Sequence, residues 1–582
     1  MIVFGDAVRM EIPRAKLASL LTRLDRIGAW GIEAHAELVA AFVETAELAQ
    51  GLADLRFLED GRDQGSRERS AAASLLQAFA EAIAKSWRGG LAVPPLEPIL
   101  DALDLLAGFD LPREIACRRA EGYAHYAVYP ETYFEAAARL GPGRIGAVVG
   151  LRSIGIGLAA MVAAGARAPL PVSVRPIGHP FRRYLDLSEE IAAEITAGHS
   201  LGVAVVDEGP GLSGSSFGVV ADLLEARGVD AARIHFFPSH AGEPGPQAEP
   251  RNLDRWRAAK RHVVTFDELV LKAPDPVTGF AAWFRDLVGD IATTEDLSGG
   301  AWRSYLPLAE RDWPPAYPQQ ERRKLLLATV TGETWLARFA GLGAYGEGKL
   351  ERAHAIAAAG LAPDTAGMRH GFILQRWHRQ SEPLIPVGEE AMETVARYLA
   401  FRGRRFATTL PGASLEALAS MLLHNVEEAL GADVASAFAS WPARALDLQD
   451  DVRPVATDNR LHCWEWFRAE DGRILKGDAL DHCEAHDLVG CQDIAYDVVG
   501  ALVEFAWYGA ARKTFLRHFE GHARDGLHPA LLAFYLPCYV AFQLGSFVMA
   551  CDSVPDNSPE RARLQREADR YATALLELAG RF

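Results

Sequence analysis

Residues 203–215 read VAVVDEGPGLSGS, and this run restricts the fold more than any other part of the chain. The four apolar residues 203–206 predict a buried strand. Two adjacent acids follow, Asp207 and Glu208, and then a loop rich in glycine and serine that leads into an apolar run with helical spacing. Carboxylates bind sugar hydroxyls, and the free N–H groups of a helix N-terminus hold phosphate. The segment therefore suits a sugar that carries a phosphate.

This run resembles the phosphoribosyl-pyrophosphate signature of the type I phosphoribosyltransferases, in which a hydrophobic strand, two acids and a Thr/Ser–Gly–Thr/Ser loop follow one another. The catalytic acidic pair corresponds to Asp207 and Glu208. The phosphate loop corresponds to Ser213, Gly214, Ser215 and Ser216. The resemblance implies binding of phosphoribosyl pyrophosphate with Mg²⁺. The alternative is an ordinary strand–turn–helix of an α/β domain.

Two more segments fit the same resemblance. Residues 145–150 are another apolar run, and Arg152 and Ser153 lie in the short polar turn after it. In the family, a turn at this place binds pyrophosphate. Arg182 and Arg183 belong to a later basic segment, which in the family closes over the leaving pyrophosphate. A solvated surface position is an equal alternative for these two arginines.

The second half of the chain carries a different pattern. Residues 324–340 predict a β-hairpin, and residues 341–360 predict a Gly-rich turn and a helix. Further on, two short strands are predicted around a turn at Asp471. Asp458 precedes this second hairpin and Asp481 follows it.

This order resembles the small-molecule kinases of the aminoglycoside-phosphotransferase and choline-kinase type. The resemblance implies that Asp458 is the catalytic carboxylate, which orients an acceptor hydroxyl. It implies that Asp481 holds Mg²⁺ on the phosphates of ATP. Asp493 and Asp497 correspond to the structural acids at the start of a downstream helix.

Several positions depart from that family. Arg338 stands where a strand lysine would contact the phosphates, and Glu347 or Glu351 on the next helix is its expected partner. Arginine is not equivalent to lysine at such a position. The family's His–Gly–Asp, with Asn five residues later, is absent, so His462 or Asn459 would have to be the second metal ligand.

A zinc site is the alternative for this region. The candidate ligands are His462, Cys463, His482, Cys483, His486 and Cys491. Their spacing contains no paired CxxC, and neighbouring residues of a strand point to opposite faces. Histidines in the core or in loops explain the enrichment equally well.

Composition excludes several classes of protein. The chain has 582 residues and a net charge of −17, so we expect several domains and no nucleic-acid partner. Its six cysteines are too few for a disulfide framework. The first twenty residues contain charges and no apolar signal core, which favours a cytoplasmic protein acting on small molecules. The sequence does not indicate an oligomeric state.

One apolar segment is long enough to cross a membrane. Residues 530–550 carry no charge, but they contain Pro537 and Gln543 and lack flanking cationic clusters. We expect a buried pair of helices broken near Pro537, and no membrane span.

The expected fold class is α/β plus α+β, in which a parallel-sheet domain precedes a bilobal kinase-like domain. The boundaries are a helical N-terminal segment (1–90), a phosphoribosyltransferase-like domain (91–250), a connector (251–318), a kinase-like N-lobe (319–380) and a kinase-like C-lobe (381–582).

Three functions remain open. The first is a transferase with two activities, which uses phosphoribosyl pyrophosphate in one half and ATP in the other, with Mg²⁺. The second is a phosphoribosyltransferase whose kinase-like half is a degenerate binding module. The third is a regulator that senses phosphoribosyl pyrophosphate or nucleotide without turnover. Neither acceptor substrate can be read from the sequence, because acceptor pockets are built from variable loops.

Overall fold

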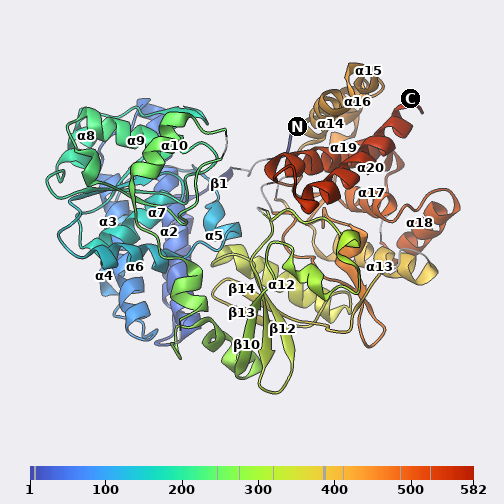
Figure 1. The fold of residues 1–582 in the computed structure, drawn as a ribbon, viewed down its shortest axis with the longest axis horizontal. Helices are drawn as coiled ribbons and strands as arrows, with labels where there is room; N and C mark the ends of the chain where they lie inside the picture. The colour runs from blue at the N-terminus through green and yellow to red at the C-terminus, as the bar shows by residue number, and fades with distance from the viewer. Residues whose placement is uncertain are drawn as a thin grey trace.

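The structure is a computed structural model, and it describes residues 1–581 apart from 5–7, 246, 274, 319, 385–387, 411, 485–486 and 525. Two halves lie side by side (Figure 1), with the first half coloured blue to green and the second yellow to red. The mixed α/β class expected from the sequence is what the structure shows.

The first half is built on a parallel sheet of five strands. In spatial order these are β4 (Val172–Val174), β3 (Ala147–Leu151), β7 (Val203–Val206), β8 (Ile234–Phe237) and β9 (Lys260–Arg261). The predicted interior strand 203–206 is confirmed, because β7 lies between β3 and β8 with all four residues buried. From β3 the chain first runs to β4 on one side and later to β7 on the other. The boundary between β3 and β7 is thus a topological switch point, where open α/β sheets bind ligands.

Helices cover both faces of this sheet. One face, with Ala204 and Val206, packs against α7 (Gly155–Ala166) and shares a buried cluster with further helices from the N-terminal half of the chain. These are α1 (Pro13–Leu24), α2 (Ile32–Asp60), α3 (Arg67–Arg88), α4 (Glu97–Ala107) and α6 (Pro130–Leu140). Val203 and Val205 face the other side, towards α8 (Glu189–Thr196) and α9 (Ser215–Ala226). The alternation follows from the period of two in a strand.

Short elements complete the first half. They are β1 (Arg9–Glu11), which pairs with β2 (Ile115–Cys117), the hairpin of β5 (Ile177–His179) and β6 (Arg182–Tyr184), and helices α5 (Glu121–His125) and α10 (Pro250–Ala258).

The predicted connector is divided between the two halves. Strand β9 completes the parallel sheet, whereas β10 (Ile291–Asp296) is the edge strand of the next sheet. The short α11 (Arg285–Val288) lies between them in the chain.

The second sheet is antiparallel and also has five strands. Its order is β10, β11 (Lys324–Thr329), β12 (Thr334–Phe339), β14 (Phe372–Arg376) and β13 (Thr365–Arg369), with α12 (Ala344–Ala358) between β12 and β13 in the chain. The hairpin predicted in 324–340 and the helix predicted in 341–360 are confirmed. Strand β13 was not expected from the sequence.

This sheet shares a hydrophobic core with the first half. The inward side chains of β11, β12 and β14, such as Leu325, Phe339 and Phe372, belong to the same buried cluster as the N-terminal helices. The N-lobe therefore packs on the parallel-sheet half.

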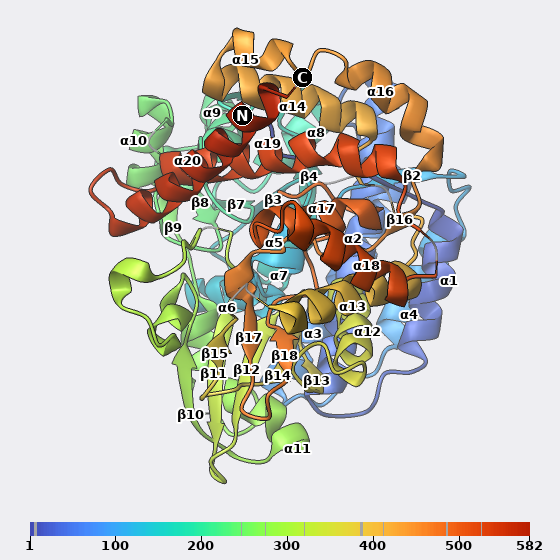
Figure 2. The same ribbon diagram turned by 90° about the vertical axis from the view of Figure 1, so that its right-hand side faces the viewer.

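The rest of the chain is mainly helical and has a core of its own. Figure 2 faces this part. Its helices are α13 (Glu389–Arg405), α14 (Leu415–Leu430), α15 (Ala432–Ser436), α16 (Trp441–Leu448), α17 (Ile494–Glu504), α18 (Ala510–His522), α19 (Pro529–Ser553) and α20 (Pro559–Ala579). Its strands are β15 (Glu382–Pro383), β17 (Trp466–Arg468) and β18 (Ile474–Lys476) in one sheet and β16 (Pro454–Val455) with β19 (Gln492–Asp493) in another. The hairpin predicted around Asp471 is confirmed by the pairing of β17 with β18.

Helix α19 corrects one expectation. The predicted break near Pro537 is wrong, because α19 runs without interruption from Pro529 to Ser553. A proline removes one backbone hydrogen bond, and packing against α14, α17 and α20 offsets that loss. Among the residues described, α19 is the helix long and apolar enough to span a membrane, and 72% of its most apolar window is buried.

Candidate ligand-binding sites

A cavity of about 880 Å³, called here the first-half cavity, lies where β3 and β7 end. Asp207, Glu208, Ser213 and Ser216 line it, as does Arg183. The structure thus brings together five of the residues that the sequence analysis selected for phosphoribosyl pyrophosphate. The reason is topological, because parallel strands place their carboxyl-terminal loops at one edge.

The acidic pair is half-buried, and its charge has little compensation. Burial raises the pKa of Asp207 from its ordinary 3.8 to about 7. Burial and then the neighbouring Asp207 and Glu121 raise the pKa of Glu208 from 4.5 to about 8. A backbone hydrogen bond from Gly122 acts in the opposite direction on Glu208. A bound cation would favour the charged form of both carboxylates.

Backbone contacts fix the position of this pair. The Tyr133 hydroxyl donates to the carbonyl of Asp207 at 2.9 Å, and the N–H of Glu208 donates to the Asp207 carboxylate at 2.8 Å. A Cβ atom on Gly122 would lie 2.8 Å from Oε2 of Glu208. Glycine at this position therefore leaves the space that the Glu208 carboxylate occupies.

The serine loop forms the N-terminus of α9. Gly214 is the N-cap residue with a φ of 63°, a left-handed conformation that glycine adopts without strain. The hydroxyls of Ser213 and Ser215 both donate to the carbonyl of Pro180, at 2.7 and 2.6 Å. Pro180 lies at the tip of the β5–β6 hairpin. The hairpin therefore contacts the serine loop directly.

The two arginines of this hairpin behave differently. Arg183 lines the cavity, and burial together with Arg175 and Arg118 lowers its pKa, so positive charge is concentrated there. Arg182 has a side chain that is 81% exposed, and it pairs with Glu249 at 3.0 Å. Arg182 does not line the cavity, because successive strand residues point to opposite sides, and its contact with a ligand stays a prediction.

Arg152 also departs from expectation. Its buried guanidinium forms ion pairs with Asp54 at 3.0 Å and Asp63 at 2.5 Å, on the side of the N-terminal helices. Arg152 does not line the first-half cavity, because these two acids draw the side chain inward. Ser153 lies in the turn that leads into α7, after a cis Arg152–Ser153 peptide bond.

Sequence reasoning missed several residues of the first-half cavity. They are Glu121, Tyr129, Thr132, Phe266, Asp267 and Arg323. They come from separate segments of the chain, and Arg323 directly precedes strand β11 of the second half. No local motif marks them.

A second cavity of about 280 Å³, the second-half cavity, lies between the antiparallel sheet and the β17–β18 hairpin. Arg338 reaches it from β12, and Asp481 reaches it from the segment after β18. The Arg338 guanidinium forms an ion pair with Asp478 and lies 3.8 Å from Asp481. The predicted approach of Arg338 and Asp481 is therefore present.

Asp478, Asp481 and His482 form an acidic cluster, with one ligand atom of each within 4.8 Å of the others. Despite burial, Arg338 and His482 hold the pKa of Asp478 well below its usual range. Arg338, Lys349 and Arg322 have the same effect on the pKa of Asp481. Two adjacent carboxylates are suitable donors for Mg²⁺. The neighbouring Arg338, Lys349 and Arg322 already compensate part of the negative charge of these carboxylates.

Asp458 does not reach the cavity as a free carboxylate. It is 1% exposed, and it accepts hydrogen bonds from the hydroxyl of Tyr398 and from Nδ1 of His482, the latter at 3.0 Å. Lys476 lies 3.5 Å away. The assignment of Asp458 as the acceptor-orienting residue is therefore not met in this structure.

The reason lies in the loop backbone. Asp497 accepts hydrogen bonds from the N–H groups of Asp458 and Asn459, at 2.6 and 2.9 Å. These bonds fix the loop so that Asp458 points inward. They also support the structural role inferred for Asp497. Asp493 has the other expected role, as the N-cap of α17.

The second metal ligand is also different from the expected one. His462 stacks on Trp464 with ring centroids 4.5 Å apart, and it is not grouped with Asp481. The side-chain amide of Asn459 donates to the carbonyls of His482 and Gly490. Asp478 and His482 are the residues grouped with Asp481, whereas His462 lines the same cavity without joining that group. Asp478 could have been found in the sequence as the first acid after the hairpin.

The expected partners of Arg338 are elsewhere. Glu347 pairs with Arg23 of α1 at 2.9 Å, and Glu351 is exposed. The zinc site considered as the alternative is not formed among the described residues, since the clusters of potential metal ligands there contain no cysteine. His486 lies outside the described residues. Two residues that were not selected, Arg460 and Glu465, line the second-half cavity.

Comparisons with known proteins give limited matches. No protein-family model matches the chain. No curated protein matches it either. Among solved structures, a choline kinase from Streptococcus pneumoniae is 15% identical with a TM-score of 0.33, over 50% of this chain and 96% of that chain. A type I macrolide 2'-phosphotransferase is 15% identical with a TM-score of 0.31, over 51% and 98%.

A choline/ethanolamine kinase family protein from Mesorhizobium loti is 14% identical with a TM-score of 0.30, over 48% of this chain and 97% of that chain. Similarities with TM-scores this low do not define what the chain does. The two cavities and their residues are the basis for a function.

Proposed function

We propose that the first half binds phosphoribosyl pyrophosphate with Mg²⁺ and transfers its phosphoribosyl group to a small acceptor. One observation carries this proposal. Asp207, Glu208, Ser213 and Ser216 line one cavity at the switch point of a parallel sheet, where α9 begins.

Each part of the site suits one part of that ligand. The backbone N–H groups of the loop and the dipole of α9 favour the 5-phosphate. Asp207 and Glu208 suit the ribose hydroxyls, either directly or through Mg²⁺, which prefers oxygen ligands. Arg183, on the covering hairpin, suits the pyrophosphate. Burial raises the pKa of both carboxylates, so their charged forms lack a compensating partner in the free protein. A bound cation would supply that partner.

Calorimetry on the full chain tests this binding. We expect phosphoribosyl pyrophosphate to bind in the presence of Mg²⁺. The double variant Asp207→Asn/Glu208→Gln should bind at least tenfold more weakly, because each carboxylate contributes charge-assisted hydrogen bonds of roughly 1.5–3 kcal/mol. Asp254→Asn, at an exposed position of α10, is the matched control. Unchanged affinity in the double variant would disprove the assignment.

For the second half we propose a kinase-like module that binds the phosphates of ATP and is not built for phosphoryl transfer. Its support is the arrangement of Arg338, Asp478 and Asp481 around one cavity, with Asp458 directed away from it. Transfer requires a carboxylate that can orient the acceptor hydroxyl. Asp458 instead binds Tyr398 and His482.

ATP titration separates the two roles. Arg338→Ala should weaken ATP binding at least tenfold and leave the affinity for phosphoribosyl pyrophosphate unchanged, since the two cavities are separate. Incubation with labelled ATP and candidate amino alcohols or sugars should give no phosphorylated product. A product whose formation is abolished by Asp458→Asn would contradict the binding-module proposal.

A further inference from the structure

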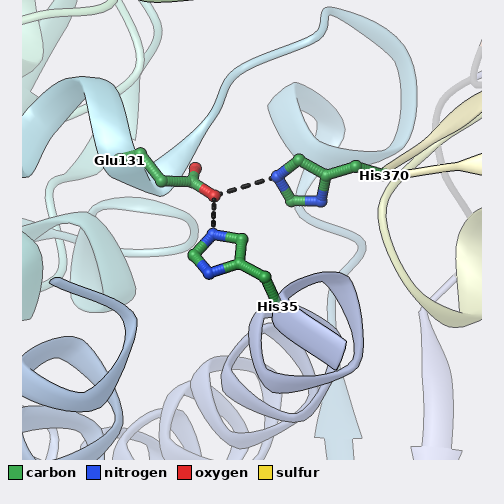
Figure 3. Close-up of side chains that lie close together, drawn as sticks. All are labelled: His35, Glu131 and His370. Carbon is green, nitrogen blue, oxygen red and sulfur yellow. Dashed lines mark hydrogen bonds and ion pairs between the residues drawn. The ribbon is translucent and has the colours of Figure 1, made fainter. Parts of the chain in front are cut away.

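A buried cluster of His35, Glu131 and His370 lies where the two halves meet (Figure 3), and neither cavity uses it. His35 is on α2, Glu131 is in the first turn of α6, and His370 is in the turn between β13 and β14. The Nε2 atoms of the two imidazoles lie 2.8 and 2.9 Å from the same Oε1 of Glu131. All three residues are at most 4% exposed.

The carboxylate of this junction cluster is incompletely paired. The two imidazoles are its partners, and they hold the pKa of Glu131 well below its ordinary value despite burial. Its second oxygen, Oε2, is buried and has no hydrogen-bond partner among the described residues. Buried carboxylates of this kind either pair with cations or coordinate metal ions.

Further contacts hold the His35 ring and the backbone of His370 in place. Nδ1 of His35 lies 2.9 Å from Oγ of Ser86, a second contact of the kind that orients metal-binding histidines. His370 has a φ of 42° and is followed by Gly371 with a φ of 88°. The first position of such a two-residue hairpin turn is most often Asn, Asp or Gly. The Tyr129 hydroxyl donates to the His370 carbonyl at 2.7 Å and holds the turn in place.

We propose that the junction cluster binds one zinc ion through Nε2 of His35, Nε2 of His370 and the carboxylate of Glu131. Two histidines and one glutamate are a donor set that zinc accepts, whereas Mg²⁺ and Ca²⁺ favour sites made of oxygen alone. With zinc at Nε2 of His35, the remaining ring proton of His35 is on Nδ1, and Ser86 Oγ accepts a hydrogen bond from it. Oε2 of Glu131, which has no hydrogen-bond partner among the described residues, is a further oxygen atom that can coordinate the ion.

The ion would connect the two halves and fix one wall of the first-half cavity. Glu131 is on the same helix turn as Thr132, which lines that cavity, and Tyr129 of the cavity wall binds the His370 turn. Metal binding in a site that exists only in the folded protein adds its binding free energy to folding. Zinc should therefore stabilise the association of the N-lobe with the parallel-sheet half.

Metal content of the full chain tests the proposal. The protein is stripped with a chelator, reloaded with Zn²⁺, desalted and analysed by mass spectrometry of the metal. The wild type should retain one zinc per chain more than His35→Asn or His370→Asn. His424→Asn is the control, since His424 is an exposed histidine paired with Glu428. The zinc content is compared between wild type and variants, because the acidic cluster also offers metal ligands and could hold zinc in all of these proteins.

Two results would overturn the proposal. One is wild-type protein that takes up no zinc after stripping, which would leave a hydrogen-bonded triad alone. The other is equal zinc content in the wild type and the folded junction variants. If those variants do not fold, Co²⁺ is titrated into stripped protein that carries His482→Asn, because His482 is the nitrogen donor of both other candidate metal groups among the described residues. The visible absorption of a four-coordinate nitrogen–oxygen site supports the proposal, and its absence refutes it.

Discussion

Replacing Asp207 by asparagine should make the free protein more stable at alkaline pH. The burial that raises the pKa of Asp207 from 3.8 to about 7 means that ionisation is disfavoured in the folded state. The folded state then binds more protons than the unfolded state, so the free energy of unfolding falls as pH rises from about 4 to about 7. Above about pH 7 the folded protein bears the full free-energy cost of a buried Asp207 charge. Asparagine has no charge and removes this cost.

The magnitude follows from the size of the pKa change. A fully buried carboxyl with this change costs about 4 kcal/mol of folding free energy, at 1.36 kcal/mol for each tenfold change in acidity. Asp207 is only half-buried, so solvent screens it and roughly 1–2 kcal/mol is expected. Loss of the negative charge also lowers the pKa of Glu208, which adds to the gain above about pH 7.

Urea denaturation without Mg²⁺ or ligand measures this gain. The wild type, Asp207→Asn and the exposed control Asp254→Asn are compared near pH 5 and near pH 8. The difference between Asp207→Asn and the wild type should grow with pH, and the control should follow the wild type. Mg²⁺ should then stabilise the wild type more than the variant. A variant that is no more stable than the wild type near pH 8 would refute this reasoning.

Two other predictions concern single contacts. Gly122→Ala should weaken phosphoribosyl-pyrophosphate binding about tenfold, or by about 1.4 kcal/mol, because the new Cβ would lie 2.8 Å from Oε2 of Glu208. The control Gly348→Ala has open space around the new Cβ and should bind with wild-type affinity. Equal affinities of the two variants in calorimetry would contradict the role given to Gly122. Arg338→Ala should lower stability by roughly 1–3 kcal/mol, since the partly exposed Asp478 loses its ion pair while the buried Asp481 keeps Arg322 at 3.3 Å. Thermal unfolding checks this, and Arg338→Lys should recover part of the loss.

The sequence by itself determined the local elements and the chemistry of their loops. Strand β7 could be predicted because apolar residues occupy both of its faces. This pattern is typical of a strand that is buried between two layers of helices. Gly214 could be placed at a loop because its positive φ is local. The hairpins of the second half follow equally from alternation and turn residues. In these cases the physical cause lies within a few residues of the position.

Only the tertiary structure decided which side chains meet. Arg152 is drawn away from the first-half cavity by Asp54 and Asp63, which lie almost a hundred residues earlier. Asp458 points inward because Asp497 binds its backbone from a helix further along the chain. Side-chain direction depends on such distant partners, and burial decides whether a charge is left free or compensated.

The junction cluster shows this most clearly, since its three residues come from positions 35, 131 and 370. No spacing in the sequence relates these residues. They meet because the N-lobe shares one hydrophobic core with the N-terminal helices, and that packing brings the β13–β14 turn to the start of α6. Local preferences therefore define each element, and the burial of apolar surface between distant elements defines the sites.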